Sequence, residues 1–351
     1  MAAVGAVAPS EFRRYADPAT ELEVFRLTDP AFASGMTAAH MRQFTRRGEA
    51  LLYWSERPLS EQPGARQAYL LDMKSGESRQ LTEAAALDPA SLALAADDKS
   101  FFFFDGPVLS EVPLTAGKTR EVHRVPEGAV RSGFGLMQDG AAVFVERQAD
   151  GAKEARSRIF SVLKQTLRRI VETDVAIDAV LPRPKRAQLV YRAGGAIFLV
   201  NADGSGRRQL KLAEGHTGDA SWTPAGRTLI YLHVPDDPKE LITLREHTPE
   251  DGSDRLLAKT SQFISASPNA DASVFTGASR SRASAYVLIL LRAAHREMTL
   301  CEHAASDPAM VRPVFSPDSQ NVLFVSDRHG KPAIYMVPVA KFVEATAAEG
   351  Q

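Results

Sequence analysis

Short runs of apolar residues recur along the whole chain, and each is bounded by Gly, Pro or Asp. The runs include LLYW, FFFF, AVFV, LVYR, LIYL and VLFV, which are rich in β-branched and aromatic residues. Such runs are typical of buried strands, and no segment shows long helical periodicity. Between the runs, Lys74-Ser75-Gly76, Asp203-Gly204 and His329-Gly330 supply the left-handed positions that tight hairpins need. The pattern predicts an all-β protein.

The strand pattern repeats. Seven similar units follow one another at residues 43–82, 92–125, 133–171, 180–210, 220–259, 264–303 and 313–339. Their turn residues are 40 to 50 positions apart: Arg47, Asp97, Asp139, Lys185, Ala225, Ala270 and Asp318. This period is typical of β-propellers, in which each blade is one four-stranded sheet. We predict a seven-bladed β-propeller.

The two ends of the chain predict how the ring closes. The last unit lacks its outermost strand, whereas the first is preceded by a spare strand-like segment, ELEVFRLTD, at residues 21–29. We expect this N-terminal strand to pair with the last blade, because pairing protects an otherwise open sheet edge. Residues 1–351 then form a single propeller domain, with residues 343–351 as a frayed tail.

Composition narrows the partners and the compartment. The 351 residues carry 42 basic and 43 acidic side chains, which excludes a general polyanion-binding surface, so no nucleic-acid partner is expected. No apolar stretch is long enough to cross a membrane. The single cysteine, Cys301, excludes a disulfide framework and a Cys-rich zinc site. The first residues do not resemble a signal peptide, which favours the cytoplasm; a removed signal peptide would place the protein in the periplasm. The oligomeric state is left open.

Several catalytic motifs are missing. There is no Gly-x-Ser-x-Gly nucleophile elbow, and residues 201–209 form a hairpin turn rather than a nucleotide-binding loop. The eight histidines are scattered singly, without a His-x-His or His-Glu-x-x-His pair. A propeller can instead assemble a site from loops that lead into its innermost strands. The loops with charged or histidine side chains contribute the candidate residues Arg183, Lys185, Arg186, Arg192, His216, Asp219, His303, Asp307 and Arg312.

Residues 11–30 and 313–339 resemble the two ends of the oligogalacturonate lyases, which are seven-bladed propellers that degrade pectin fragments. The string SDRHGKPAIYMV carries much of this resemblance, and the blades between match more loosely over the family's full length and order. The resemblance implies an acidic oligosaccharide as partner, cleaved by β-elimination. It also implies a histidine base and a manganese ion held by three histidines and a glutamine.

The family's metal and base positions are only partly kept. His216, six residues before Trp222, resembles one metal ligand, and Asp307 stands at the glutamine position, where a carboxylate also suits a divalent ion. Met310 and Arg312 replace two histidines, so the metal site is expected to be degraded. The base histidine falls at Arg192 or, with a shift of one residue, at Tyr191.

Two functions follow from this departure. In the first, the chain is a lyase-like enzyme in which Arg312 replaces the metal, Arg183 and His216 help to bind the uronate, and Tyr191 or Arg192 accepts the proton. Free Tyr and Arg have pKa values of about 10 and about 12, so either residue would need a strongly lowered pKa to accept the proton. In the second, the propeller is a non-catalytic module that binds an acidic saccharide or another protein.

The candidate residues also have plain structural interpretations. Arg192 and Arg312 would then solvate the channel mouth or pair with Asp219 and Asp307. His303 with Asp307 is a weaker candidate ligand pair. We expect Trp54 and Trp222 to lie in the core, and Arg168-Arg169 and Arg207-Arg208 to be solvated on hairpins or outer strands.

Overall fold

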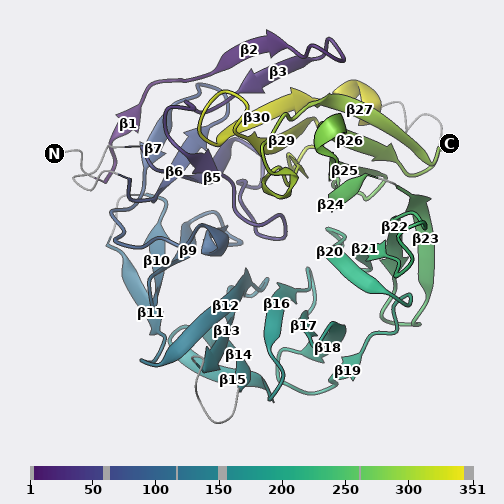
Figure 1. The fold of residues 1–351 in the computed structure, drawn as a ribbon. Coiled ribbons are helices and arrows are strands. Elements are labelled where there is room, and N and C mark those ends of the chain that lie inside the picture. Colours follow the sequence, from purple (N-terminus) through teal and green to yellow (C-terminus); the bar gives the residue numbers. More distant parts are fainter. Residues whose placement is uncertain (1–3, 58–63, 116–117, 149–155, 261, 344–351) are drawn as a thin grey trace.

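The structure, a computed structural model, describes residues 4–57, 64–115, 118–148, 156–260 and 262–343. Seven antiparallel sheets stand around a central axis as the blades of a propeller (Figure 1). The predicted all-β, seven-bladed architecture is confirmed. Among the described residues, no helix is both long enough and apolar enough to span a membrane.

Blades 1 to 4 take up the first part of the chain, and in each the strands run in sequence order from the axis outward. Blade 1 contains β4 (Ser34–Gly35), β5 (Ala50–Ser55), β6 (Gln67–Asp72) and β7 (Ser78–Gln80), with β1 (Val7–Ala8) added outside β7. Blade 2 contains β8 (Ala93–Leu94), β9 (Ser100–Asp105), β10 (Val108–Pro113) and β11 (Arg120–Arg124). Blade 3 contains β12 (Ala129–Leu136), β13 (Ala142–Gln148), β14 (Ser157–Leu163) and β15 (Thr166–Thr173). Blade 4 contains β16 (Ile177–Pro182), β17 (Gln188–Ala193), β18 (Ala196–Asn201) and β19 (Arg208–Gln209).

Blades 5 to 7 complete the ring. Blade 5 contains β20 (His216–Trp222), β21 (Leu229–Val234), β22 (Thr243–His247) and β23 (Asp254–Lys259). Blade 6 contains β24 (Phe263–Pro268), β25 (Val274–Ser279), β26 (Tyr286–Leu291) and β27 (Arg296–Glu302). Blade 7 contains β28 (Val314–Phe315), β29 (Asn321–Ser326), β30 (Ala333–Pro338), β3 (Glu23–Arg26) and β2 (Arg13–Ala16). Three short 3-10 helices are η1 (Pro89–Ser91), η2 (Arg282–Ser284) and η3 (Pro308–Met310).

The ring closes as predicted, through the N-terminal segment. β3 pairs antiparallel with β30, opposing Phe25 to Met336 and Arg26 to Tyr335. The structure adds two strands that the sequence did not predict, since β2 lies outside β3 and β1 lies outside β7. Val343, the first residue of the predicted tail, packs against a core cluster, and residues 344–351 lie outside the described residues.

The repeat has a clear backbone basis in the hairpin between the first two strands of each blade. Every one of these seven hairpins contains one residue with a positive φ, at Gly48, Asp98, Gly140, Lys185, Gly226, Ala272 and Ser319. In several blades an aspartate before this position accepts the backbone N–H two residues on, as Asp318 does from Gln320 at 3.0 Å. Such Asx turns and left-handed positions explain the recurrent Pro, Asp and Gly of the units.

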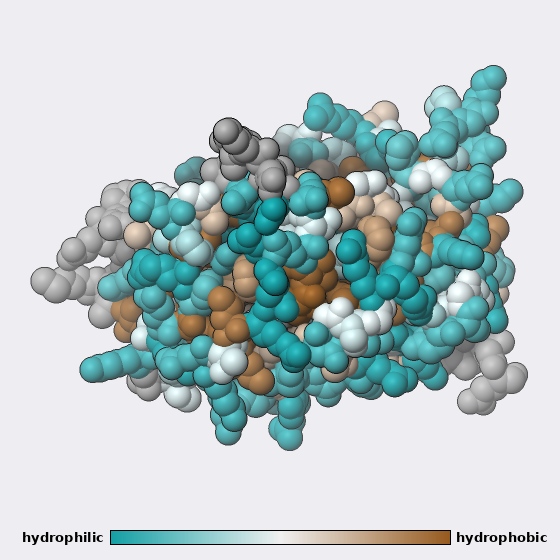
Figure 2. All heavy atoms as spheres, turned by 90° about the horizontal axis from the view of Figure 1, so that it is seen from below, coloured by the Kyte–Doolittle hydropathy of each residue, from teal (hydrophilic) through white to brown (hydrophobic). Residues whose placement is uncertain are grey.

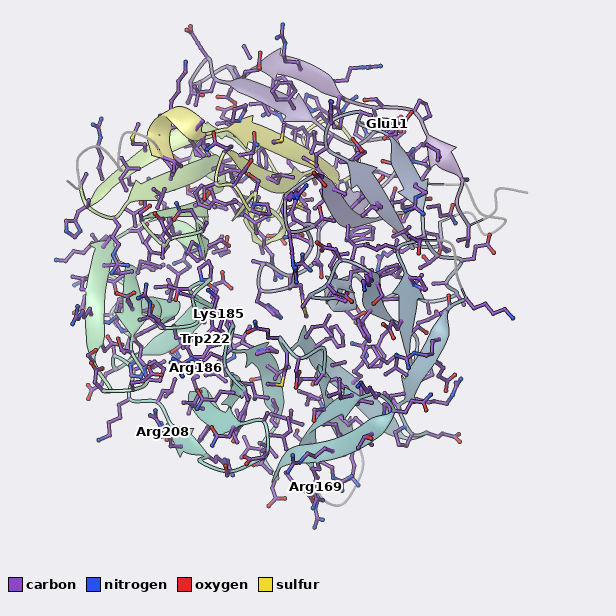
Figure 3. The ribbon with its side chains drawn as sticks, turned by 180° about the vertical axis from the view of Figure 1, so that it is seen from behind. Glu11, Arg169, Lys185, Arg186, Arg208 and Trp222 are labelled. Carbon is purple, nitrogen blue, oxygen red and sulfur yellow. The ribbon has the colours of Figure 1, made fainter. Side chains whose placement is uncertain are left out.

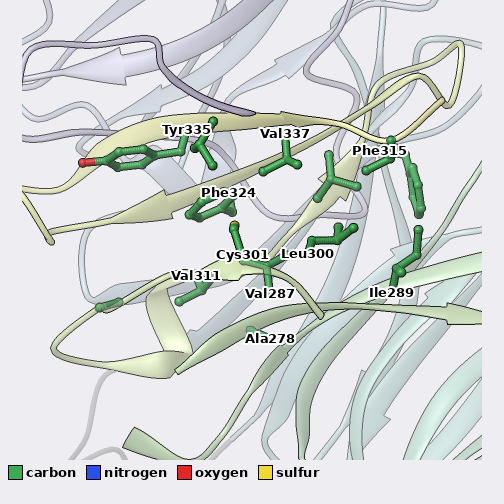
Figure 4. Packing of buried hydrophobic residues seen from close by; sticks show 14 of the residues in the cluster. Ala278, Val287, Ile289, Leu300, Cys301, Val311, Phe315, Phe324, Tyr335 and Val337 are labelled. Atoms are coloured by element: carbon green, nitrogen blue, oxygen red, sulfur yellow. The ribbon is translucent and has the colours of Figure 1, made fainter. Parts of the chain in front are cut away.

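The hydrophobic core lies between adjacent blades. The cluster between blades 6 and 7 contains Val287, Cys301, Phe324 and Tyr335, and the last two rings stack at 5.4 Å (Figure 4). Seen edge-on, the rim of the ring is mostly hydrophilic with scattered apolar side chains (Figure 2). Packed side chains therefore fill the space between these blades.

Candidate functional site

A cavity of about 440 Å³ lies at the axis, on the side where the innermost strands begin. Its walls come from blades 1, 4, 5, 6 and 7. Its polar and charged lining residues are His40, Asp178, Tyr191, Arg192, Asp219, Ser221, Ser265, Ser267 and Arg312. The volume is within the range of small-molecule sites.

β-Bulges aim several of these side chains at the cavity. The register of β16 slips at Asp178, that of β20 at Gly218 and Asp219, and that of β24 at Ile264. All four residues line the cavity. A bulge leaves a residue out of the ladder and can turn its side chain away from the blade, which accounts for the exposure of an isoleucine here.

Two arginines from different blades face the cavity, and neither forms an ion pair among the described residues. Arg192 lies on β17, on the strand face opposite Tyr191, and makes no ion pair or hydrogen bond with its side chain among the described residues. Arg312 follows η3, and its Nε donates only to the carbonyl oxygen of Ala309, at 3.2 Å. The backbone of Arg312 has φ 35°, a left-handed conformation that costs free energy in a non-glycine residue. Neither arginine forms the expected ion pair with Asp219 or Asp307.

Asp219, which lines the cavity, connects blade 5 to blade 6. Its Oδ2 accepts the backbone N–H of Ala266 at 3.1 Å, which ties β20 to β24. The Asp219 side chain is exposed. Desolvation by the surrounding ring raises the pKa of its carboxyl group, whereas the Ala266 N–H and the charges of Arg312 and Arg192 lower it. The two arginines therefore interact electrostatically with Asp219, although neither forms an ion pair with it.

His40 enters the cavity from blade 1. It belongs to the loop after β4, which reaches toward the centre of the ring (Figure 1). Its Nε2 lies 3.2 Å from the carbonyl oxygen of Phe134 on β12. The His40 side chain is exposed. Desolvation by the surrounding ring lowers the pKa of His40, and the charge of Arg312 lowers it further. His40 also borders a second cavity, of about 380 Å³, where the innermost strands end.

Tyr191 is placed differently from the expected base. Its side chain is buried among the residues between blades 3 and 4, and its ring stacks on Phe198 at 5.2 Å. Burial raises the pKa of Tyr191, so the phenol keeps its proton. This placement favours a packing role rather than proton acceptance.

Arg183 is not available for a substrate. Its guanidinium donates to the carbonyl oxygens of Gly226 and Arg227, to Gln188 Oε1 and to Glu250 Oε1, and it stacks over Trp222 at 4.7 Å. Only 2% of Arg183 is exposed. This geometry favours an interblade role for Arg183 over the predicted substrate-binding role, because its donors already join blades 4 and 5.

The two predicted metal ligands are engaged separately. His216 begins β20 at the surface, with Nε2 3.4 Å from Asp236 Oδ1, and it does not line the cavity. Asp307 caps η3, where Oδ1 accepts the Ala309 N–H at 3.0 Å. His303 is buried and accepts the Ala305 N–H at 3.0 Å. Among the described residues, no three His, Cys, Asp or Glu side chains come together as metal ligands.

The remaining expectations concern packing and surface. Trp222 is buried and donates from Nε1 to the Leu181 carbonyl oxygen at 3.2 Å, and Trp54 is partly buried against the core. Figure 3 places Trp222 nearer the centre of the ring, with Arg169 and Arg208 toward the rim. Arg169 and Arg208 lie on the outermost strands β15 and β19, as expected.

Sequence reasoning missed His40, Asp178 and Ile264. His40 precedes the first recognised repeat unit, because the innermost strand of blade 1 has only two residues and leaves no periodic signal. Asp178 interrupts an apolar strand, which is a usable signal for a residue turned out of the ladder. Ile264 carries no such signal, since an apolar residue within a strand normally indicates core.

No protein-family profile matches the chain. In sequence it is similar to oligogalacturonide lyase of Pectobacterium atrosepticum, with 24% identity over 94% of this chain and 97% of that protein. It is also similar to oligogalacturonate lyase of Dickeya dadantii, with 21% identity over 93% of this chain and 96% of that protein. The resemblance expected from the ends of the chain is thereby confirmed over nearly its full length.

Solved structures give the same picture of the fold. A structure described as oligogalacturonate lyase in complex with manganese superposes with a TM-score of 0.90 at 24% identity, covering 97% of this chain and 100% of the other. Oligogalacturonate lyase of Vibrio parahaemolyticus gives 0.88 at 22% identity, covering 96% of this chain and 99% of the other. At this identity the likeness establishes a common propeller fold.

Proposed function

We propose that this chain, a relative of the oligogalacturonate lyases in sequence and fold, binds short uronic acid oligosaccharides in the axial cavity and cleaves them by β-elimination. The observation that carries the proposal is the pair of arginines, Arg192 and Arg312, which line one cavity from two blades without an acidic partner among the described residues. Unpaired cations in an enclosed site favour a small anionic ligand.

The arginines suit the charge that an elimination develops. Removing the proton next to a uronate carboxylate places negative charge on the carboxylate oxygens, and a fixed cation stabilises that charge. A guanidinium can hold a carboxylate through two parallel hydrogen bonds. Arg312 and Arg192 therefore clamp the carboxylate. Because a guanidinium stays protonated in proteins, Arg192 binds the anion rather than accepting a proton.

The rest of the cavity suits a sugar ring. Ile264 is 37% exposed on the bulge of β24, and Leu181 and Ile197 line the same cavity. These apolar side chains can contact the C–H face of a pyranose, while the arginines hold its acidic edge. The cavity therefore offers one apolar wall, two guanidinium groups and the carboxyl groups of Asp178 and Asp219, and the two arginines are the groups that favour a uronic acid over a neutral sugar.

The cavity residues do not fit the manganese site implied by the relatives. His40, Asp178 and Asp219 are of ligand type, but these three do not come together as a ligand group among the described residues, and two guanidinium groups face the same space. Positive charge of this kind repels a divalent cation. We propose that Arg312 carries the electrostatic role instead.

The test is the ultraviolet absorbance of the unsaturated uronide formed from short oligogalacturonides, with added manganese and separately with a chelator. We expect a rise that the chelator does not change. Arg312→Gln should lower kcat/KM by about 10²- to 10³-fold, because it removes a charge that stabilises the transition state. Arg255→Gln, on the outermost strand β23, is the matched control and should leave the rate unchanged.

Other outcomes separate the alternatives. A manganese-dependent rise would show that a metal site forms and would contradict the arginine clamp. No rise in either condition, with saccharide binding detected by calorimetry, would favour a non-catalytic acidic-saccharide-binding propeller. Neither product nor binding would overturn both functions and would leave protein interaction as the better account.

A further inference from the structure

The second cavity, of about 380 Å³, adjoins the axial cavity on the side where the innermost strands end. The two cavities have four lining residues in common, Ala39, His40, Ser221 and Ser267. Of these four side chains only the imidazole of His40 is large. A ligand longer than one sugar ring can therefore extend along the axis from one cavity into the other.

The second cavity differs from the first in charge. Arg42 and Arg46 line it, and among the described residues no Asp or Glu side chain does. The carboxylate of Asp98 is taken up by the Arg42 guanidinium and by the backbone N–H of Arg46. Arg46 donates from Nη2 to the carbonyl oxygen of Ala96 at 2.6 Å and forms no ion pair within the part of the chain that the structure describes. A guanidinium with N–H groups to spare favours a carboxylate ligand.

Two buried polar side chains of the second cavity lack a hydrogen-bond partner. Gln43 is 3% exposed and Ser221 is 8% exposed, and neither Oε1 of the first nor Oγ of the second makes a hydrogen bond among the described residues. Buried polar atoms in native proteins are nearly always hydrogen-bonded, so unpaired ones on a cavity wall call for a polar ligand. An amide and a hydroxyl each donate and accept, which suits the hydroxyl groups of a sugar.

Rigid apolar side chains complete the second cavity. Phe315 and Trp222 line it, together with proline rings from the ends of the innermost strands and the hairpins that follow them: Pro182, Pro184, Pro224, Pro268 and Pro317. Such a wall can contact the C–H face of a pyranose. The second cavity therefore combines an unpaired guanidinium, hydrogen-bonding groups and an apolar wall, as the axial cavity does, and this favours the same class of ligand.

We propose that the second cavity is the binding site for a second uronate unit of the same oligosaccharide, an inference that rests on the proposed function. One unit lies in the axial cavity with its carboxylate at Arg312 and Arg192. The next unit lies in the second cavity, with its carboxylate at Arg46 and its hydroxyl groups at Gln43 and Ser221. The glycosidic bond crosses from one cavity to the other. The ring thus selects chains of at least two uronate units.

The experiment compares the binding of galacturonate and of digalacturonate by calorimetry. The wild-type chain should bind digalacturonate about 10-fold more tightly, because the second carboxylate adds charge-assisted hydrogen bonds. Arg46→Gln should remove this difference and leave the affinity for galacturonate unchanged, since Arg192 and Arg312 still hold it. Arg47→Gln, at an exposed arginine that lines neither cavity, is the matched control and should keep both affinities. In the absorbance assay Arg46→Gln should raise KM and not lower kcat, because no charge develops on the second carboxylate.

Ala39→Leu tests the passage between the two cavities. Ala39 is only partly buried, so the fold can accept the larger side chain, which narrows the place where the cavities meet. We expect this variant to bind digalacturonate no more tightly than galacturonate.

The outcomes separate this inference from the proposed function. If Arg46→Gln keeps the wild-type affinity for digalacturonate, the second unit does not bind in the second cavity, and the proposed function still stands. Tight binding of digalacturonate by Ala39→Leu would also overturn the inference, because the second unit would then extend out of the mouth of the axial cavity. A wild-type chain that binds neither saccharide would overturn the proposed function itself.

Discussion

Arginine residues have two different roles near the axis, and the acceptors around each one decide which. Arg183 donates hydrogen bonds to two backbone carbonyls, a glutamine and a glutamate, so its guanidinium is fully engaged between blades 4 and 5. Arg312, within the part of the chain that the structure describes, donates a hydrogen bond to the carbonyl oxygen of Ala309 alone. The first arginine is structural, and the second is free to bind an anion. Sequence presents both as basic residues near a blade start and cannot tell them apart.

At the residue scale, we predict that Arg183→Met lowers the free energy of unfolding by about 2–4 kcal/mol. The change leaves the buried carbonyl oxygen of Gly226 and the partly buried carbonyl oxygen of Arg227 without their donor. Urea unfolding followed by tryptophan fluorescence measures the loss. Arg186→Met, an exposed arginine in the same loop, is the control and should change stability by less than about 0.5 kcal/mol. Equal stabilities of the two variants would contradict the interblade role of Arg183.

At the scale of elements, one turn helps to anchor the N-terminal strands that close the ring. Asp17 is 1% exposed and lies between β2 and β3. Its Oδ1 accepts the N–H groups of Ala19 and Thr20, and its Oδ2 accepts the Glu302 N–H at the end of β27, at 2.9 Å. The turn that starts the closing strand is thus tied to blade 6 as well as to blade 7.

We predict that Asp17→Ala lowers the free energy of unfolding by about 2–4 kcal/mol, because three backbone donors lose a buried acceptor. Hydrogen exchange should show faster exchange in β3 and in the facing strand β30, where the ring closes. Asp174→Ala, an exposed aspartate, serves as the control. Slow exchange in β3 and β30 of the variant would mean that pairing alone holds the closure.

The elements show how far sequence reasoning reaches. The strands of the seven units and the closing role of residues 21–29 were predictable, because apolar runs and turn residues are local signals. The bulges at Asp178, Asp219 and Ile264 were not, because a bulge depends on which strand lies opposite. Arg312 and Arg192 could be proposed from sequence because they lie within recognised repeat units or just before one. His40 could not, because it precedes the first recognised unit.

At the scale of the whole molecule, several enclosed histidines couple stability to pH. Burial lowers the pKa of His303 and of His247 from the ordinary value of 6.5, and both side chains are almost fully buried. Between the lowered value and 6.5, the unfolded chain binds protons that the folded chain does not. Stability is therefore complete above the unfolded value and falls as the pH decreases below it.

We predict that the free energy of unfolding decreases between about pH 7 and about pH 5, and that His303→Asn makes this decrease smaller. Asparagine keeps an acceptor for the Ala305 N–H but cannot gain a proton. Urea unfolding at several pH values measures the slope. A slope unchanged in His303→Asn would place the pH dependence on other groups.

The sequence by itself determined the class, the seven blades and the closing strand, because strand runs and hairpin turns are set by residues close together in the chain. It also pointed to Arg312, which lies before the innermost strand of blade 7, whereas Arg192, expected in such a loop, lies on β17. Only the tertiary structure decided that Arg183 and Tyr191 are engaged in packing and that His40, Asp219 and the two arginines share one cavity. These residues come from blades that are distant in sequence, and the ring alone brings them together.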